Sequence, residues 1–304
     1  MTIRRALRGL SVVAALALIS IFFPSSGFSL HRLSAKAVIG VQDMHQGFDR
    51  ACAPGAGTMS NWWTSSPYWY VGIYIGGSNK SCTNDSNLTS SWISDVNSNG
   101  MEWSFVPFYV GLQSQCVFQS GLAEFSNDTT TANSEGSNAA DYAISDAESL
   151  GFTNSIVYFD LEAFDTSNST CLAAAEAFVR GWVNELQNRG WTAGLYGSSG
   201  ASAMDDMYHL SANPTDAMLA DYNDSNSPWG ISSVPNSDWE YDHRIHQYHV
   251  DSTCETHGGI CLNVDRNCAI GKTAKAWSVS TETSEPSGSS ESDGPSEDVP
   301  PCGS

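Results

Sequence analysis

The sequence predicts an α/β fold, a (β/α)8 TIM-type barrel that is distorted around its last strands. Short runs of apolar, β-branched and aromatic residues recur eight times within residues 38–277, and amphipathic helical segments separate those in the middle. Runs that are apolar throughout are typical of parallel strands buried on both faces. Eight of them fit a closed barrel. An open flavodoxin-like sheet is the alternative, and the number of strands and the lack of a glycine-rich phosphate turn disfavour it.

Each expected element has its own signal. The first strand is short and ends at Phe48 and Asp49, and later strands are stopped by glycines or acids. The other seven expected strands span residues 70–77, 103–111, 155–165, 192–197, 217–222, 244–248 and 262–265. The expected helices span residues 59–65, 88–99, 138–150 and 170–188. Helical pattern is scarce around the last strands, which is why we expect the barrel to be distorted there.

The two ends of the chain differ from the middle. Residues 1–37 have basic residues, then an apolar run and a small-x-small triplet, which is the pattern of a secretory signal peptide. Arg4-Arg5 leaves a twin-arginine export route as an alternative. Residues 278–304 are rich in Ser, Glu, Pro, Gly and Asp, so we expect a disordered, dispensable acidic tail. The barrel domain is therefore expected at residues 38–277.

The charge and the apolar segments limit the partners and the location. The formal net charge is −20, which disfavours nucleic acid and anionic lipid as partners. No segment after the signal peptide is long and apolar enough to span a membrane. We expect a monomer. The signal peptide pattern predicts that it is secreted, and either extracellular or associated with a cell wall.

All eight cysteines follow the predicted signal peptide, so disulfides are expected. Their positions in loops near strand ends suggest the pairs Cys52–Cys82 and Cys116–Cys171. Cys302 lies in the predicted tail and is expected to lack an internal partner, which would leave at least one further cysteine free.

Two acids end the fourth expected strand. Side chains alternate along a strand, so Asp160 and Glu162 lie on the same side, with Leu161 opposite. Two neighbouring carboxylates in a partly desolvated site repel each other, which can separate their pKa values for general acid and base roles. The alternative is that both are solvated and cap the next element.

Polar residues also follow the other expected strands. In a barrel these strand ends meet on one face, where active sites are built. A single acid in such a place can equally be a helix cap or a turn residue. The recurring polar residues are Asp49, Tyr109, Tyr196, Asp221, Gln247 and Asp265.

Metal and serine-hydrolase sites are not expected. The spacing of His243, His246 and His249 resembles a metal site, but His246 would face away from the other two on a strand. There is no C-x-x-C pair, and Ser198-Ser199 does not lie in a G-x-S-x-G motif. We therefore expect neither a metal nor an organic cofactor.

Several motifs resemble a known family. They are Gly47-Phe48-Asp49, Val71-Gly72-Ile73-Tyr74-Ile75-Gly76-Gly77, Pro107-Phe108-Tyr109-Val110-Gly111-Leu112-Gln113, Tyr158-Phe159-Asp160-Leu161-Glu162, Gly194-Leu195-Tyr196-Gly197, Arg244-Ile245-His246-Gln247-Tyr248 and Val264-Asp265-Arg266. Together they resemble the secreted bacterial glycoside-hydrolase-like family known as domain of unknown function 1906. That family is similar to the family 25 lysozymes, which are muramidases on a (β/α)8 barrel. The resemblance implies a catalytic site of Asp49, Asp160, Glu162 and Asp265, with Glu162 as the general acid.

The functional hypothesis is a secreted glycosidase that acts on a cell-wall polysaccharide built from amino sugars, either peptidoglycan-like or chitin-like. Tyr109, Tyr196, Asp221 and Gln247 are its expected substrate-binding residues. The alternative is a glycan-binding or wall-associated barrel protein without catalytic activity.

Overall fold

The computed structural model describes residues 44–98, 100–240, 242–250, 253–274 and 302. The predicted signal peptide, and the predicted tail apart from Cys302, lie outside these residues. Within the described part of the chain, no helix is both long enough and apolar enough to cross a membrane.

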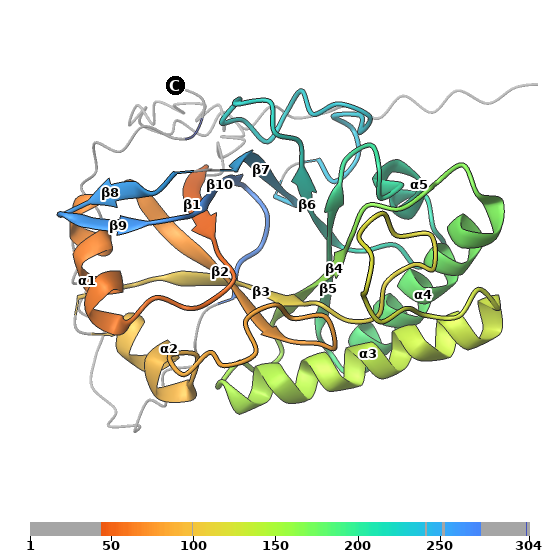
Figure 1. Ribbon diagram of the computed structural model, residues 1–304, viewed down its shortest axis with the longest axis horizontal. Coiled ribbons are helices and arrows are strands. Elements are labelled where there is room, and N and C mark those ends of the chain that lie inside the picture. The colour runs from red at the N-terminus through yellow and green to blue at the C-terminus, as the bar shows by residue number, and fades with distance from the viewer. Residues whose placement is uncertain (1–43, 99, 241, 251–252, 275–301, 303–304) are drawn as a thin grey trace, which may run out of the picture. The chain divides into compact units, whose positions relative to one another are not determined.

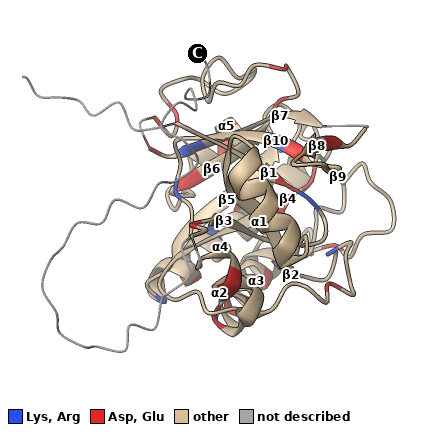
Figure 2. Ribbon diagram, turned by 90° about the vertical axis from the view of Figure 1, so that its left-hand side faces the viewer, with Lys and Arg blue, Asp and Glu red and all other residues tan. Residues whose placement is uncertain are grey.

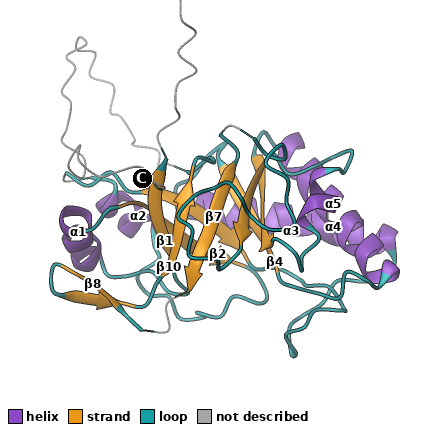
Figure 3. Cartoon of the chain, turned by 90° about the horizontal axis from the view of Figure 1, so that it is seen from above, coloured by secondary structure: helices purple, strands orange, loops and turns teal. Residues whose placement is uncertain are grey.

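Eight strands close into a barrel in the order β1-β10-β7-β6-β5-β4-β3-β2 (Figure 1), which confirms the predicted fold. Helices α1 and α2 lie on one side of the strands and α3, α4 and α5 on the other (Figure 3). The barrel strands are β1 His45–Asp49, β2 Tyr68–Gly76, β3 Ser104–Tyr109, β4 Ile156–Leu161, β5 Thr192–Ser198, β6 Asp216–Ala220, β7 Arg244–Val250 and β10 Asp265–Ala269.

The last barrel strand differs from the prediction. We expected a parallel strand over residues 262–265, but β10 begins at Asp265 and is antiparallel to both β1 and β7. The chain returns from β7 through a hairpin instead of a helical crossover, and such a connection reverses the direction of the strand. Asp265 therefore begins its strand, and it lies opposite Asp49 in the register of β1 and β10.

The described helices are α1 Ala56–Ser65, α2 Ser90–Val96, α3 Thr129–Ser149, α4 Ser169–Asn188 and α5 Met204–Tyr208. The predicted start of α3 at Asn138 was wrong. The first part of this helix is rich in Thr, Ser, Asn and Gly, which are weak helix formers. It forms because the Asp128 side chain accepts from the Thr131 N–H as an N-cap and because α3 packs on α4.

Glycine allows α3 and α4 to approach closely. A Cβ on Gly136 would lie 2.0 Å from the Phe178 carbonyl oxygen, and one on Gly181 would lie 2.0 Å from that of Asn133. Only a hydrogen fits at these two places. The two backbones therefore meet directly, and α4 in turn covers β5.

Aromatic rings fill the inside of the barrel. The Phe108 ring contacts those of Tyr74, Tyr158 and Tyr196, with centroid distances of 5.0, 6.2 and 5.7 Å. The strands beside the rings use glycine, since a Cβ on Gly194 would lie 2.5 Å from the Tyr158 ring. The barrel is therefore packed inside, and polar groups meet at its rim.

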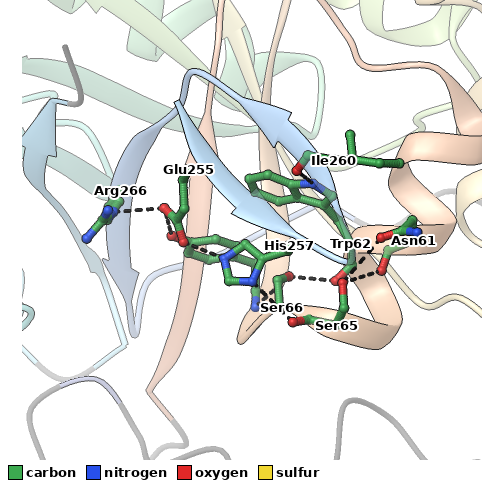
Figure 4. A network of polar contacts seen from close by, with 9 residues as sticks. Asn61, Trp62, Ser65, Ser66, Glu255, His257, Ile260 and Arg266 are labelled. Carbon is green, nitrogen blue, oxygen red and sulfur yellow. Dashed lines mark hydrogen bonds and ion pairs between the residues drawn. The ribbon is translucent and has the colours of Figure 1, made fainter. Parts of the chain in front are cut away.

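A hairpin not predicted from the sequence joins β7 to β10. It consists of β8 Glu255–His257 and β9 Ile260–Leu262, and it lies beside α1 (Figure 1). Glu255 accepts hydrogen bonds from the Tyr68 hydroxyl at 2.8 Å and from Arg266 Nε at 2.9 Å, and it pairs with His257 (Figure 4). The Trp62 indole donates to the Ile260 carbonyl at 3.2 Å. These contacts fix the hairpin in a place where a regular barrel would have a helix.

The long connection between β6 and β7 contains no α-helix within its described residues, as expected for a distorted barrel. It is held by Arg244, which is fully buried. The guanidinium donates to the carbonyls of Asp238 at 2.7 Å and Pro228 at 3.2 Å, and it lies 5.0 Å from the Trp229 ring centroid. A single buried cation thus orders a segment that lacks regular structure.

Four disulfides join all eight cysteines. The predicted pairs Cys52–Cys82 and Cys116–Cys171 are confirmed, with Cα–Cα distances of 5.5 and 6.1 Å. The prediction that Cys302 lacks a partner was wrong, because it is bonded to Cys268 on β10. The composition of the predicted tail concealed this pair, because disulfide connectivity depends on the fold and cannot be deduced from the sequence alone.

Candidate active site

Four acids meet at one rim of the barrel. Asp49 ends β1, Asp160 lies near the end of β4, and Glu162 follows β4 directly. Asp265 lies at the same rim because it pairs with Asp49 across the two strands. These are the four predicted catalytic residues, and the topology gathers them from three strands. Figure 2 shows acidic residues in red and basic residues in blue over the same ribbon.

Asp49 is fully buried and is held by three side chains. Its Oδ2 accepts from Gln247 Nε2 at 2.8 Å and from Asn267 Nδ2 at 2.9 Å. Its Oδ1 accepts from the Tyr74 hydroxyl at 3.2 Å. Burial nevertheless raises the pKa of Asp49 to about 6, because the three hydrogen bonds only partly offset the loss of water around the charged form.

Gln113 holds the end of β4 in place. This fully buried side chain donates from Nε2 to the Asp160 carbonyl at 2.7 Å and accepts at Oε1 from the Glu162 N–H at 2.9 Å. The two contacts resemble those that a neighbouring strand would make, although the register of β3 and β4 ends at Tyr109 and Phe159. Gln113 therefore extends the sheet by one side chain and keeps Asp160 and Glu162 on the same side.

The two acids of this pair differ in their surroundings. Asp160 is 3% exposed, and its Oδ1 is buried without a hydrogen-bond partner among the described residues. Burial, then the charges of Glu162 and Asp49, raise the pKa of Asp160 well above its ordinary value. Glu162 is only partly buried, and burial raises its pKa as well. The pair therefore retains a proton at a pH where free carboxyls have lost theirs.

Two tyrosines and Gln247 complete the rim. The Tyr196 hydroxyl donates to Gln247 Oε1 at 2.8 Å, and the Tyr222 hydroxyl donates to the same oxygen at 3.3 Å. Gln247 in turn donates to Asp49, so a chain of hydrogen bonds runs from the tyrosines to this carboxylate. Tyr222 is 58% exposed, and its ring is open to solvent beside the acids.

Two predicted substrate-binding residues do not join this cluster. Tyr109 lies on the other side of β3, where its ring stacks on Trp182 of α4 with a centroid distance of 6.2 Å. Asp221 follows β6, and its Oδ2 accepts from the Ser232 N–H at 2.9 Å and from Asn223 at 3.0 Å. Alternation along the strand explains the first case, since Phe108 points inward and Tyr109 outward. In the second case the acid is a turn residue.

Sequence reasoning missed four residues that shape the site. Tyr74 and Gln113 were visible within the family motifs, but nothing in the sequence distinguished them from structural positions. Asn267 was missed because β10 was expected to end at Asp265. Tyr222 was treated as the end of a strand. The missed residues are Tyr74, Gln113, Tyr222 and Asn267.

The histidines near β7 do not come together. His246 is buried between the carbonyls of Ser227 and Asp221, at 2.6 and 2.8 Å. His243 pairs with Asp216, and His249 pairs with Asp224. Each histidine therefore has its own contacts among the described residues.

One group of described residues could offer three metal ligands. Atoms of Asp205, His209 and Asp238 lie within 4.8 Å of one another. They belong to α5 and the segments beside it, not to the strand ends that carry the four acids. Asp205 and His209 have side chains that are 50% and 64% exposed, and such groups are common on protein surfaces.

The arrangement suits acid-assisted cleavage of a neutral polymer. It offers a partly exposed carboxyl whose pKa is raised, a deeper carboxyl with an oxygen that has no hydrogen-bond partner among the described residues, and an open aromatic ring beside both. These are the groups required to protonate a leaving oxygen, to stabilise positive charge on a sugar ring, and to stack against its apolar face.

Comparisons with known proteins agree with the fold. Residues 60–269 match the family model described as Rv2525c-like, glycoside hydrolase-like domain. None of the curated proteins matches the sequence. Among solved structures, an uncharacterized Bacillus stearothermophilus protein is 18% identical with a TM-score of 0.50, over 74% of this chain and 95% of that one.

Two further structures are similar at lower scores. The catalytic domain of endolysin ply40, from a bacteriophage of Listeria monocytogenes, is 16% identical with a TM-score of 0.46. The alignment covers 74% of this chain and 93% of that one. A family 25 glycosyl hydrolase from Bacillus anthracis is 14% identical with a TM-score of 0.44, over 76% of this chain and 91% of that one.

Proposed function

Because the chain belongs to the Rv2525c-like, glycoside hydrolase-like family, we propose that it is a secreted glycosidase that cleaves an amino-sugar polymer of a cell wall. Residues 38–277 form the catalytic domain in this proposal, after removal of a signal peptide at residues 1–37. The observation that carries it is the pair formed by Asp160 and Glu162, buried to different depths at the barrel rim and held in register by Gln113.

Glu162 is the general acid. It is the more exposed member of the pair and lies two residues further along the chain, so its longer side chain can reach a glycosidic oxygen at the barrel rim. Burial raises its pKa, which favours the protonated form that a general acid requires. Protonation of the leaving oxygen allows the bond to the sugar carbon to break, and a water molecule then adds to that carbon and releases a proton that restores the acid.

Asp160 stabilises the positive charge that develops on the sugar ring, or orients a 2-acetamido group against it. Burial and the nearby charges of Glu162 and Asp49 make the Asp160 carboxylate unfavourable without a bound sugar. A cationic sugar ring beside it offsets this cost, so the carboxylate is stabilised mainly as the bond breaks. Asp49 and Asp265 contribute further negative charge at the same rim.

Tyr196, Gln247 and Tyr222 bind the substrate. The exposed Tyr222 ring offers a face for a sugar, while its hydroxyl is fixed by Gln247. The polymer is peptidoglycan-like or chitin-like. Such a polymer has a sugar backbone without negative charge, so the acids of the site do not repel it.

The test is hydrolysis of purified cell walls and of chitin, measured by the release of reducing ends. We expect the wild type to cleave one of them, and Glu162→Gln to lose about 10²–10⁴-fold in rate while it still binds the polymer. Asp160→Asn should also be severely impaired. Glu148→Gln, which neutralises an exposed acid on α3, is the matched control.

Equal rates for wild type and Glu162→Gln would refute the assignment of the acid. If the wild type binds one of these polymers but cleaves neither, the protein is a glycan-binding barrel without catalytic activity.

A further inference from the structure

A hollow of about 240 Å³ lies on the outside of the barrel, separate from the four acids. The segments that follow β2 and β3 form one wall, and α3 forms the other. Drug-sized ligands occupy sites of about 300–1,000 Å³, so this hollow has room for a smaller group. The side chains that line it include Ser78, Tyr109, Leu112, Glu135, Asn138 and Tyr142.

Tyr109 contributes a hydroxyl to this hollow. The residue is 7% exposed, and its ring is fixed against Trp182. The hydroxyl has no hydrogen-bond partner among the described residues, yet it is not among the side-chain atoms that are sealed from solvent. A buried tyrosine normally satisfies its hydroxyl within the protein. Here the hydroxyl is open to the hollow and available to a ligand.

The pKa of Tyr109 supports a role as a donor. Burial, then the charges of Asp146 and Tyr142, raise it to about 12. The phenol is therefore protonated at any physiological pH, and it can donate a hydrogen bond.

The other polar groups of the hollow are also available. Within the described residues, the side chains of Ser78 and Asn138 make no hydrogen bond, although both line the hollow. Glu135 uses one oxygen, Oε2, to accept from the Ser126 N–H at 2.7 Å. Tyr142 is 65% exposed and presents its ring at the edge. The hollow thus combines aromatic and apolar surface with a hydroxyl, an amide and a carboxylate.

We propose that this hollow is a second glycan-binding site, which takes one neutral sugar ring. A sugar has apolar C–H faces that stack on Tyr142, and hydroxyls that pair with Tyr109, Asn138 and Ser78. The Glu135 carboxylate and the net charge of −20 disfavour anionic ligands. The choice of a sugar as the ligand rests on the proposed function. The observation that polar groups in the hollow are available to a ligand is independent of that function.

The experiment uses the full chain carrying Glu162→Gln, so that the probe is not cleaved, and titrates it with chitotriose while the amide NMR signals are recorded. We expect signals around Ser78, Leu112 and Asn138 to shift as a set, separately from those around Asp160. Asn138→Leu, which keeps the size but removes the amide, should weaken binding at the hollow roughly tenfold. Tyr109→Phe should weaken it less.

Ser145→Ala, an exposed change on α3, is the control and should leave binding unchanged. The proposal is overturned if the signals of the hollow do not move or if Asn138→Leu binds as tightly as its parent. It is also overturned if a trimethylammonium compound binds there and chitotriose does not, because the aromatic rings would then bind a cation and not a sugar.

A second measurement separates this proposal from the first. Asn138→Leu, made in the otherwise wild-type chain, should cleave a short soluble oligosaccharide at the wild-type rate but should bind polymer less tightly. If Asn138→Leu loses both the cleavage of the short oligosaccharide and the binding of polymer, the hollow is part of the catalytic site and the proposal of a second site is wrong. If chitotriose binds at the hollow but the wild type cleaves nothing, the proposed glycosidase activity is refuted and the second binding site stands.

Discussion

At the scale of single residues, Asp49 carries the clearest electrostatic cost. It lies at the end of β1 with no accessible surface, and three neutral donors face its carboxylate. In the unfolded chain its pKa would be near 4, and in the fold it is about 6. Between these values the folded protein binds more protons than the unfolded chain, so the stability that this residue contributes falls as the pH rises.

The first prediction concerns this pH dependence. Below about pH 4 both states are protonated and the folded state carries no penalty, whereas above about pH 6 the full penalty is present. A shift of this size corresponds to about 3 kcal/mol. Asp49→Asn keeps the shape, and we expect it to stabilise the protein by up to about that amount at pH 8, with a flatter profile between pH 4 and pH 6. Urea denaturation across this range measures both effects.

Two comparisons make this test specific. Asp95→Asn, an exposed change on α2, should leave the profile unaltered. Asp160→Asn should flatten the profile too, because burial raises the pKa of that residue in the same direction. If Asp49→Asn is less stable than the wild type at pH 8 and equally dependent on pH, the hydrogen bonds to this carboxylate outweigh its burial.

The sequence predicted the acids of the site better than their partners. Alternation along one strand placed Asp160 and Glu162 on the same side, because that relation is local. The donors to Asp49 come from residues 74, 247 and 267, which only the closed barrel brings together. Tyr109 shows the limit of the local argument. Its position at the end of a strand predicts that it lies near the rim of the barrel, but not whether its side chain points into the barrel or toward the helices outside.

At the scale of secondary-structure elements, the end of β4 depends on a side chain from another element. Gln113 supplies both a donor and an acceptor to the backbone beyond the last register pair of β3 and β4. Without it the Asp160 carbonyl and the Glu162 N–H would lose their described partners in a buried region. The geometry of Asp160 and Glu162 therefore depends on one amide.

The second prediction follows from this contact. Gln113→Leu is similar in size but leaves two backbone groups unpaired, which should reduce the free energy of unfolding by about 1–3 kcal/mol. We also expect the turnover number to fall more than tenfold while KM changes little, because the spacing of the two carboxylates is no longer fixed. Calorimetry and steady-state kinetics on the same preparation measure the two effects.

Gln115→Leu is the matched control, since Gln115 is exposed and lies two residues further along. A loss of stability without any loss of turnover would show that Gln113 supports the fold but does not position the acids. A changed pH profile of the remaining activity would support a positioning role, because the coupling of Asp160 and Glu162 depends on their separation.

Element boundaries could be predicted where the periodicity was strong. The predicted α4 differs from the observed helix only at its first residue, because its apolar face repeats through residues 171–186. In contrast, the first part of α3 lacks a strong helical pattern, and its stability comes from the cap at Asp128 and from α4. The β8–β9 hairpin could not be predicted either, since its three-residue strands are held by contacts to α1 and Arg266.

At the scale of the whole molecule, the fold class could be predicted because eight apolar runs leave few alternatives. The direction of the last strand could not, since it depends on how the chain crosses from β7. The disulfide between Cys268 and Cys302 was concealed for a similar reason. It ties the end of the chain to β10, although the composition of residues 278–304 predicts little tertiary packing.

This disulfide changes what truncation should do. From the sequence alone, a chain ending at Ala276 should melt like the full protein. The disulfide closes a 34-residue loop, and in the chain-entropy model this closure stabilises the fold by about 4 kcal/mol. Removing Cys302 should therefore lower the stability by about that amount. It also leaves the Cys268 thiol buried and unpaired.

The last prediction separates the covalent bond from the segment that it closes. We expect the full chain to melt highest. The full chain carrying Cys268→Ala and Cys302→Ala, and a chain that ends at Ala276 and carries Cys268→Ala, should melt lower and at the same temperature as each other. Their equality would show that residues 277–301 stabilise the barrel only through the bond. If the truncated chain melts clearly below the full-length double variant, the tail packs on the barrel, and the composition of residues 278–304 misled the prediction. If all three melt together, the bond contributes nothing and the tail is dispensable after all.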